Sequence, residues 1–481
     1  TYLKDLMKKP IKIYGPPGTG KTFRLIRRVN AYVRTGTPYH KIGYFAFTKK
    51  AAIEARKRIG VDEKEVPYFQ TLHAFCFHLL DLSEDSIMQP HHYEDLGKIL
   101  NVRVSFNDKY NDEQTHFLTC NNPYFQMIGR AINKDISIEE EFNLNEHDRK
   151  DIDPVILRHI YINLQVYKDK NHLLDFNDLI KLVVKSDKIP KLKAIFIDEA
   201  QDLSPLQWQL YDRLKENCED MYLAGDDDQA IFAWAGADVN RFIKEPADEK
   251  VLRYSRRVSK AVQEQSQIAV DRIAGIRKHK EYLPRAQEGL ASHINNLGQV
   301  DLTKGKWLIL TRTRSNLLDI MKELKNKNVY YQSNKGKSFN VGIYNGAMAY
   351  QKWIREGEIG EKEINDVREY IPSGNWDPEK NWYDIFVADQ KEILYIRNII
   401  FGGEKLSENA RVWVSTIHAA KGGEEDNVIL SLHQGSKVQK SIRLSVDKQD
   451  EEHRVWYVGT TRARNNLYKL KAKKKIKEYQ L

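Results

Sequence analysis

Cysteine is scarce in this sequence, and its distribution argues against several classes of site. Cys76, Cys120 and Cys218 are the only cysteines among the 481 residues, and no two of them form a C-x-x-C pair. Zinc sites, iron–sulfur clusters and disulfide frameworks need closely spaced or paired cysteines. We therefore expect none of these, and a protein suited to a reducing compartment.

Long apolar runs are also missing. No apolar stretch approaches the length that spans a membrane, and the first residues lack the apolar core of a signal peptide. We therefore expect a soluble protein that neither binds a membrane nor is secreted. Its expected location is the cytoplasm of a bacterium or of a virus-infected host cell.

Acidic residues are fewer than basic ones. Lys and Arg number 77 against 67 Asp and Glu, so the formal net charge is +10. This balance is compatible with a polyanionic partner. Aromatic residues are plentiful, with 25 Tyr, 17 Phe and 8 Trp. Aromatic side chains beside basic ones are what a groove for single-stranded nucleic acid requires.

The segment 11–22 carries the strongest local signal. It reads IKIYGPPGTGKT, a short apolar run followed by the pattern G-x-x-x-x-G-K-T. Its glycines let successive N–H groups point at an anion, and a helix starting near Lys21 adds its positive end. Lys21 can reach the β- and γ-phosphates of a nucleotide, and the Thr22 hydroxyl can bind Mg²⁺. The predicted phosphate-binding residues are Gly15, Pro16, Pro17, Gly18, Thr19, Gly20, Lys21 and Thr22.

A second apolar run ends in two carboxylates. Residues 194–202 read AIFIDEAQD, which places Asp198 and Glu199 at the end of a predicted strand. Asp198 fits a metal site shared with Thr22, and Glu199 fits a general base for the attacking water. The alternative interpretation is a strand followed by an ordinary acidic helix start. The upstream phosphate loop favours the first interpretation.

Further motifs follow in a characteristic order. Residues 45–52 read FAFTKKAA, 71–75 TLHAF, 175–179 DFNDL, 225–237 GDDDQAIFAWAGA, 416–424 TIHAAKGGE and 451–464 EEHRVWYVGTTRAR. Together with DEAQD, this set resembles the motifs of the UvrD/Rep-type superfamily 1A DNA helicases. The resemblance extends from residue 15 to residue 464 and therefore covers nearly the whole chain.

The resemblance implies an α/β fold with two RecA-like motor domains, each carrying an inserted, mostly helical subdomain. The first motor domain is expected at 1–82 and 171–250, with the first insertion at 83–170. The second motor domain is expected at 251–340 and 411–481. Its insertion, 341–410, is much shorter than is usual in the family.

The resemblance also assigns roles to individual residues. It implies that ATP and Mg²⁺ are the cofactors and that Gln229 senses the γ-phosphate. Arg257 and Arg462 correspond to two arginines that reach the nucleotide from the second motor domain. Glu424 corresponds to an acid that approaches the nucleotide sugar.

Single-stranded DNA and single/double-strand junctions are the implied partners. The positions that match DNA contacts are Phe47, Thr48, His73, Phe232 and Trp234. Core packing is the alternative interpretation of Phe47 and Phe232, and a structural histidine is the alternative for His73.

The sequence is therefore expected to encode an ATP-hydrolysing, 3′→5′ DNA helicase that works as a monomer. One alternative is a single-stranded DNA translocase that displaces proteins with little strand separation. Another is a nucleotide-switched nucleic-acid-binding module. The family functions in DNA repair and replication.

Overall fold

The computed structural model describes residues 9–106, 120–145, 152–371 and 374–481. Every predicted site residue lies within these ranges. The chain divides into two compact units. Unit 1 comprises Thr1–Gln287 and Ser441–Val458, and unit 2 comprises Glu288–Lys440 and Gly459–Leu481.

A six-stranded parallel sheet forms the centre of unit 1, with strand order β3-β2-β4-β5-β1-β6. Its strands are β1 (Ile11–Tyr14), β2 (Ile42–Ala46), β3 (Phe69–Thr71), β4 (Leu192–Ile197), β5 (Cys218–Gly225) and β6 (Asp248–Val251). All five residues of β2 are buried. Such apolar runs are typical of parallel strands covered on both faces.

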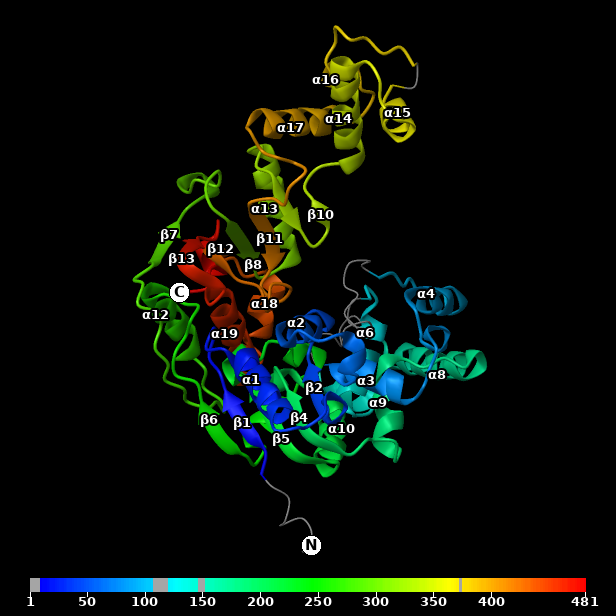
Figure 1. The fold of residues 1–481 in the computed structure, drawn as a ribbon, viewed down its shortest axis with the longest axis vertical. Coiled ribbons are helices and arrows are strands. Elements are labelled where there is room, and N and C mark those ends of the chain that lie inside the picture. The colour runs from blue at the N-terminus through cyan, green and yellow to red at the C-terminus, as the bar shows by residue number, and fades with distance from the viewer. Residues whose placement is uncertain (1–8, 107–119, 146–151, 372–373) are drawn as a thin grey trace, which may run out of the picture. The chain divides into compact units, whose positions relative to one another are not determined.

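Helices cover both faces of this sheet (Figure 1). Strand side chains alternate between the faces, so Tyr44 joins one core and Phe45 the other. Buried side chains of α1 (Lys21–Arg34) and α2 (Lys49–Ile59) belong to the core that contains Tyr44. The core that contains Phe45 takes side chains from α3 (Leu72–Leu79), α9 (Phe176–Lys185), α10 (Pro205–Glu216) and α11 (Val239–Lys244).

The segment expected to form the first insertion is helical where it is described. Its helices are α4 (Pro90–Ile99), α6 (Pro123–Lys134), α7 (Ile138–Leu144) and α8 (Pro154–Asn171). They share a separate core in which Tyr93, Phe125 and Leu164 are buried. Asn122 and Asp153 cap the N-termini of α6 and α8 through their side-chain oxygens, directly before a proline in each case.

Unit 1 also includes segments from later in the chain. These are α12 (Lys260–Val270) and most of α19 (Val446–Thr460). The Asp450 carboxylate on α19 accepts hydrogen bonds from the backbone N–H groups of Ala274 at 2.9 Å and Gly275 at 2.7 Å. These bonds fasten α19 to the segment that follows α12.

Unit 2 contains a seven-stranded sheet of order β10-β9-β11-β8-β12-β13-β7, parallel except for the β9–β10 pair. Its strands are β7 (Leu290–Ile294), β8 (Trp307–Thr311), β9 (Tyr331–Ser333), β10 (Gly336–Lys337), β11 (Val412–Thr416), β12 (Glu425–Ser431) and β13 (Ala463–Leu470). Its helix α13 (Arg314–Asn326) packs against β8 and β11. Two helix-flanked, largely parallel sheets confirm the predicted α/β class.

The segment expected to form the short second insertion is a helical subdomain with its own core (yellow to orange in Figure 1). Its helices are α14 (Val341–Glu356), α15 (Glu361–Arg368), α16 (Trp382–Ile385) and α17 (Gln390–Phe401). Tyr350 and Trp382 are buried there, and the rings of Trp353 and Trp376 meet edge to face with centroids 5.1 Å apart. The tryptophans of this segment therefore serve as core.

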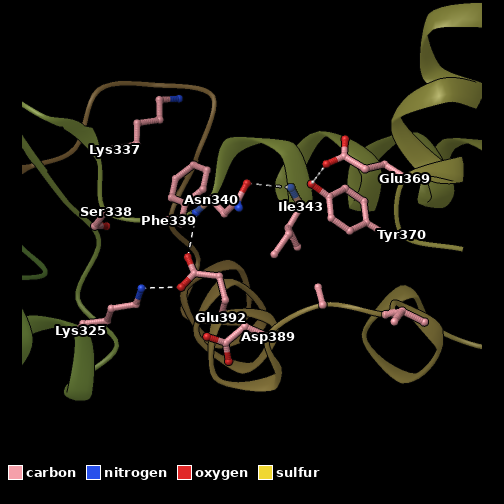
Figure 2. A pocket seen from close by; sticks show the side chains of 12 residues that line it. Lys325, Lys337, Ser338, Phe339, Asn340, Ile343, Glu369, Tyr370, Asp389 and Glu392 are labelled. Carbon is pink, nitrogen blue, oxygen red and sulfur yellow. Dashed lines mark hydrogen bonds and ion pairs between the residues drawn. The ribbon is translucent and has the colours of Figure 1, made fainter. Parts of the chain in front are cut away.

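A cavity of about 560 Å³ lies at the base of this subdomain (Figure 2). Lys325 of α13 and Glu392 of α17 form an ion pair of 2.5 Å at its wall. Glu392 also accepts a hydrogen bond of 2.8 Å from the backbone N–H of Asn340. These contacts join the subdomain to the sheet-bearing part of unit 2. Across the described ranges, no helix is both long enough and apolar enough to cross a membrane.

Candidate functional site: a phosphate loop and an aromatic cluster

The phosphate loop connects β1 to α1 at the carboxyl end of the unit 1 sheet, where ligands of open α/β sheets bind. Gly18 and Gly20 have φ of +72° and +86°, which side chains with a Cβ rarely adopt. A Cβ at Gly15 would lie 2.1 Å from Cγ of Lys21. Lys21 Nζ donates to the Gly15 carbonyl at 3.1 Å. The loop therefore curls around the Lys21 side chain, as the sequence pattern requires.

Asp198 faces this loop from the end of β4. Its carboxylate accepts hydrogen bonds from the Thr22 hydroxyl at 2.5 Å and from the Tyr44 hydroxyl at 3.0 Å. Burial raises the pKa of the Asp198 carboxyl, and the neighbouring Glu199 adds to the rise. A hydroxyl and a carboxylate side by side fit a hard divalent cation that keeps several waters. In the described residues, no group of three or more His, Cys, Asp and Glu side chains forms an alternative metal site.

Glu199 adopts a left-handed backbone conformation, with φ 54° and ψ 40°, between β4 and the short helix that begins at Ala200. Its carboxylate lies 3.6 Å from Lys21 Nζ and accepts a 2.7 Å hydrogen bond from Gln201. Non-glycine residues in this conformation are strained and often occur at functional sites. The candidate base and the predicted phosphate-binding lysine are therefore neighbours.

Gln229 is buried in a turn that follows β5. Its side-chain amide donates to the Asp226 carboxylate at 2.7 Å. The backbone N–H of Asp226 donates to the Gln201 side chain at 2.9 Å. Gln201 therefore links Glu199 to the Gln229 turn. Sequence reasoning singled out neither Gln201 nor Asp226, although both lie inside the motifs it quoted.

Arg257 lies directly against the phosphate loop, within unit 1. The Ser255 hydroxyl donates to the Pro17 carbonyl at 2.7 Å, and the backbone N–H of Arg256 donates to the Gly18 carbonyl at 2.8 Å. A Cβ at Gly18 would lie 2.2 Å from Cβ of Arg257. The sequence places Arg257 in a second motor domain that starts at 251, whereas unit 1 extends to Gln287. No sequence signal pointed to Ser255.

Three of the predicted DNA-binding residues form an aromatic cluster. The rings of Phe47 and Phe232 stack with centroids 5.2 Å apart, and Trp234 lies 6.4 Å from Phe232. Trp234 is 40% exposed, whereas Phe47 and Phe232 are half-buried. The Thr48 hydroxyl accepts a hydrogen bond from the backbone N–H of Ala51 and thereby caps α2. The cluster therefore offers an open aromatic edge at Trp234.

His73 lies in the core rather than on this surface. Its side chain is buried and meets Phe176 edge to face, with ring centroids 5.9 Å apart. Burial lowers the pKa of the imidazole to about 4, so the ring is neutral at pH 7. Among the described residues, its Nδ1 atom finds no hydrogen-bond partner. DNA binding by His73 stays a prediction, and it would require the ring to become accessible.

Arg462 and Glu424 lie together in unit 2, each directly before a strand. The Arg462 guanidinium is buried and donates to the Gly423 carbonyl at 3.1 Å. The backbone N–H of Glu425 donates to the Arg462 carbonyl at 3.1 Å. The Glu424 carboxylate pairs with Arg464 at 3.0 Å. The two motifs that contain these residues therefore meet where β12 and β13 begin.

Comparison with protein families agrees with this arrangement. The model of the UvrD/REP helicase N-terminal domain matches residues 3–250, and that of the UvrD-like helicase C-terminal domain matches residues 390–474. The chain belongs to the UvrD/Rep helicase family. The predicted resemblance is thereby confirmed. The segment 251–389, which contains Arg257, lies outside both matches.

Relatives from two bacterial genera match parts of the chain. The ATP-dependent DNA helicase PcrA of Bacillus subtilis is 25% identical over 399 residues, covering 75% of this chain and 51% of the relative. PcrA of Staphylococcus aureus is 26% identical over 249 residues, covering 49% of this chain and 33% of the relative. The chain thus spans about half, or less, of the length of the curated relatives it matches.

Proposed function

We propose that this UvrD/Rep family member is an ATP-dependent DNA helicase that moves 3′→5′ along single-stranded DNA. One observation carries the proposal. The candidate nucleotide residues are linked through Gln201 and Asp226 to Gln229, and only four residues separate Gln229 from the exposed Trp234. One short segment therefore runs from the nucleotide site to a surface on which bases can stack.

For hydrolysis, the loop amides and Lys21 bind the phosphates of ATP, and Thr22 and Asp198 hold Mg²⁺. The bound cation would neutralise charge on the β- and γ-phosphate oxygens. Glu199 accepts a proton from the attacking water. Gln229 contacts the γ-phosphate, and Arg257 stabilises the charge that develops on it. The family resemblance gives Arg462 a further part in hydrolysis and Glu424 a contact with the nucleotide sugar.

For DNA binding, Trp234 and its neighbours Phe47 and Phe232 provide aromatic faces. Stacking contributes about 1–3 kcal/mol per base and does not select sequence, which suits a motor that steps along any strand. Single/double-strand junctions are the proposed site of unwinding, and the working form is proposed to be a monomer. DNA repair and replication are the processes that such a motor serves.

A second candidate function is a translocase that displaces proteins but separates strands poorly. The compact helical subdomain formed by α14–α17 favours it, because the family resemblance implies a larger insertion at this place. A nucleotide-switched binding module is a third candidate. The intact set of Lys21, Glu199 and Gln229 argues for hydrolysis instead.

The test uses the full chain with three substrates. ATPase is measured with and without single-stranded DNA, and strand separation is measured on duplexes with a 3′ or a 5′ single-stranded tail. The proposal expects DNA-stimulated ATPase and unwinding from the 3′ tail. If a protein bound to the tailed duplexes is displaced while the strands stay paired, the translocase is favoured. ATP binding without DNA-stimulated hydrolysis would favour the switched module.

A further inference from the structure

Three consecutive buried aspartates form the turn that carries Gln229. Asp226, Asp227 and Asp228 are 0%, 0% and 2% exposed. A single ammonium group, Nζ of Lys280, lies among them, 3.2 Å from Asp226 and 2.8 Å from Asp228, and it also pairs with Asp227. Burying charge is costly unless it is paired, so this lysine is needed for the turn to form.

Two arginines also bind this turn. Arg277 binds the Asp228 carboxylate with two hydrogen bonds, of 3.0 and 2.9 Å. Arg454 of α19 donates to the Asp227 carbonyl at 3.0 Å. Burial alone would lower the pKa of Lys280, but the three carboxylates outweigh it and raise the pKa, so the group stays charged.

Lys280 and Gln229 share one carboxylate. Oδ1 of Asp226 pairs with the Lys280 ammonium, and Oδ2 accepts the 2.7 Å hydrogen bond from the Gln229 side-chain amide. The other two aspartates also pair with Lys280. Asp226 therefore connects Lys280 with Gln229 directly, through the two oxygens of one carboxylate.

We propose that Lys280 is a positioning residue for ATP hydrolysis, which holds Gln229 in its working orientation by fixing the Asp226 carboxylate. The inference rests on the proposed function, because it takes Gln229 as the residue that contacts the γ-phosphate. In this role Lys280 acts through Asp226 rather than by contacting the nucleotide. The alternative is that Lys280 only neutralises the turn and serves stability alone.

A matched pair of substitutions separates these roles. Asp226→Asn and Asp227→Asn each remove one carboxylate from Lys280 at a fully buried site. Lys280 and Gln229 bind different oxygens of the Asp226 carboxylate, and Asn puts an NH₂ donor in place of one of these oxygens. An NH₂ that faces Gln229 breaks or reverses the Gln229 bond, and an NH₂ that faces Lys280 removes the contact that fixes residue 226. Asn at 227 leaves the Lys280–Asp226–Gln229 path intact.

We expect Asp226→Asn to lower the DNA-stimulated kcat about 10- to 100-fold, with little change in KM for ATP. Asp227→Asn should stay within about threefold of the wild type, because the geometry at Gln229 is unchanged. Melting temperatures are measured for both proteins. An equal loss of kcat in the two variants overturns the inference, as does unfolding of Asp226→Asn alone.

A double-mutant cycle gives the second readout. Lys280→Met should lower kcat in the wild-type background but not further in a Gln229→Ala background. Lys278→Met is the control, because the Lys278 ammonium lies on the same segment and pairs with Glu249 at 2.5 Å. Independent losses of kcat from Lys280→Met and Gln229→Ala overturn the inference. If Lys280→Met fails to fold, the matched asparagine pair decides.

Failure of the proposed function looks different. A wild-type protein without DNA-stimulated ATPase refutes the helicase proposal itself. A Gln229→Ala protein with wild-type kcat refutes the sensor role of Gln229. The positioning inference fails by itself when Gln229→Ala lowers kcat and the two asparagine variants behave alike.

Discussion

Glu199 shows how single residues in this site combine strain with chemistry. Its left-handed backbone turns the side chain toward Lys21 and Gln201 immediately after β4. Such a conformation costs a non-glycine residue about 1–3 kcal/mol, and the surrounding structure must supply that energy. The side-chain NH₂ of Gln201 donates to the Glu199 carboxylate, and its side-chain oxygen accepts from the backbone N–H of Asp226. These two hydrogen bonds hold the turn in place. The strain is therefore used to place a carboxylate beside the phosphate loop.

Glu199→Gln should preserve ATP binding and lower hydrolysis by about 10²–10⁴-fold, because an amide cannot accept the proton of the attacking water. ATP binding by fluorescence titration and DNA-stimulated turnover are measured together. Lys21→Ala is the comparison variant. It should lose both ATP binding and turnover, because it removes the positive charge that binds the β- and γ-phosphates. Near-wild-type ATPase in Glu199→Gln would show that another group is the base.

His73 makes the stability of the fold depend on pH. Its pKa is about 4 in the folded protein against 6.5 for an unperturbed histidine. As the pH falls, the unfolded state therefore binds a proton at His73 before the folded state does. The contribution of His73 to the free energy of unfolding is fully present above pH 6.5 and is lost as the pH falls toward 4. We expect a loss of about 3 kcal/mol in the free energy of unfolding from His73 between these limits.

Urea unfolding at pH 7, 5.5 and 4 tests this expectation. As the pH is lowered, the free energy of unfolding should fall less steeply in His73→Gln than in the wild type. His40→Gln is the control, because it makes the same substitution at an exposed histidine. Identical pH dependence in His73→Gln and the wild type would contradict the assignment.

Among the elements, the turn and short helix between Asp226 and Ala235 join the two halves of the candidate site. One end is held by Lys280, and the other by Asn133 of α6, whose side chain donates to the Ala235 carbonyl at 2.9 Å. The predicted first insertion, which includes α6, therefore contacts the segment that carries Trp234. This short segment, held at both ends, connects Gln229 with the aromatic cluster.

Trp234→Ala should weaken binding of single-stranded DNA by about 1–3 kcal/mol through the loss of base stacking. Basal ATPase without DNA should survive, since no group at the phosphate loop is removed. Trp413→Ala is a matched control, because Trp413 in unit 2 is also 40% exposed. DNA titration is paired with a thermal melt. A large fall in melting temperature with unchanged affinity would show that Trp234 serves packing.

At the scale of the whole molecule, unit 1 holds more of the chain than the predicted first motor domain. Residues 251–287 and 441–458 pack in unit 1, although the sequence places them in the second motor domain. The physical reason is the charged turn at 226–228, which needs Lys280, Arg277 and Arg454 as partners. The motor-domain boundaries themselves stay a prediction.

Arg462→Ala tests whether a residue of unit 2 takes part in hydrolysis. An arginine that stabilises the transition state is worth about 10³–10⁵ in rate, so kcat should fall strongly while DNA affinity stays nearly intact. Arg462 is buried, so a thermal melt accompanies the kinetics. Arg411→Ala, at an exposed arginine of the same unit, is the control. An equal loss of DNA binding would show a structural or phosphate-contacting role.

DNA affinity should also fall steeply with salt, in keeping with the net charge of +10. Each contacted phosphate of a single strand contributes a slope of about −0.7 to log K against log salt through counterion release. Titrations between low and moderate salt measure the slope. An affinity that does not change with salt would show that stacking alone binds the strand.

The sequence by itself determined the family, the α/β class and the local form of the phosphate loop. These rest on contiguous residues, because glycines, a lysine and a threonine in G-x-x-x-x-G-K-T act on one another within a few positions. Likewise, DEAQD follows its strand directly, so Asp198 and Glu199 could be assigned candidate roles without coordinates. Their exact partners, Tyr44 and Gln201, could not be inferred in this way.

Only the tertiary structure decided which distant residues meet. Lys280 lies more than fifty positions from the aspartates it neutralises, and Ser255 more than two hundred from Pro17, so no local pattern links them. The same holds for the stacking of Phe47 on Phe232 and for the burial of His73. Burial and charge pairing depend on how the chain packs in three dimensions, and a motif records neither.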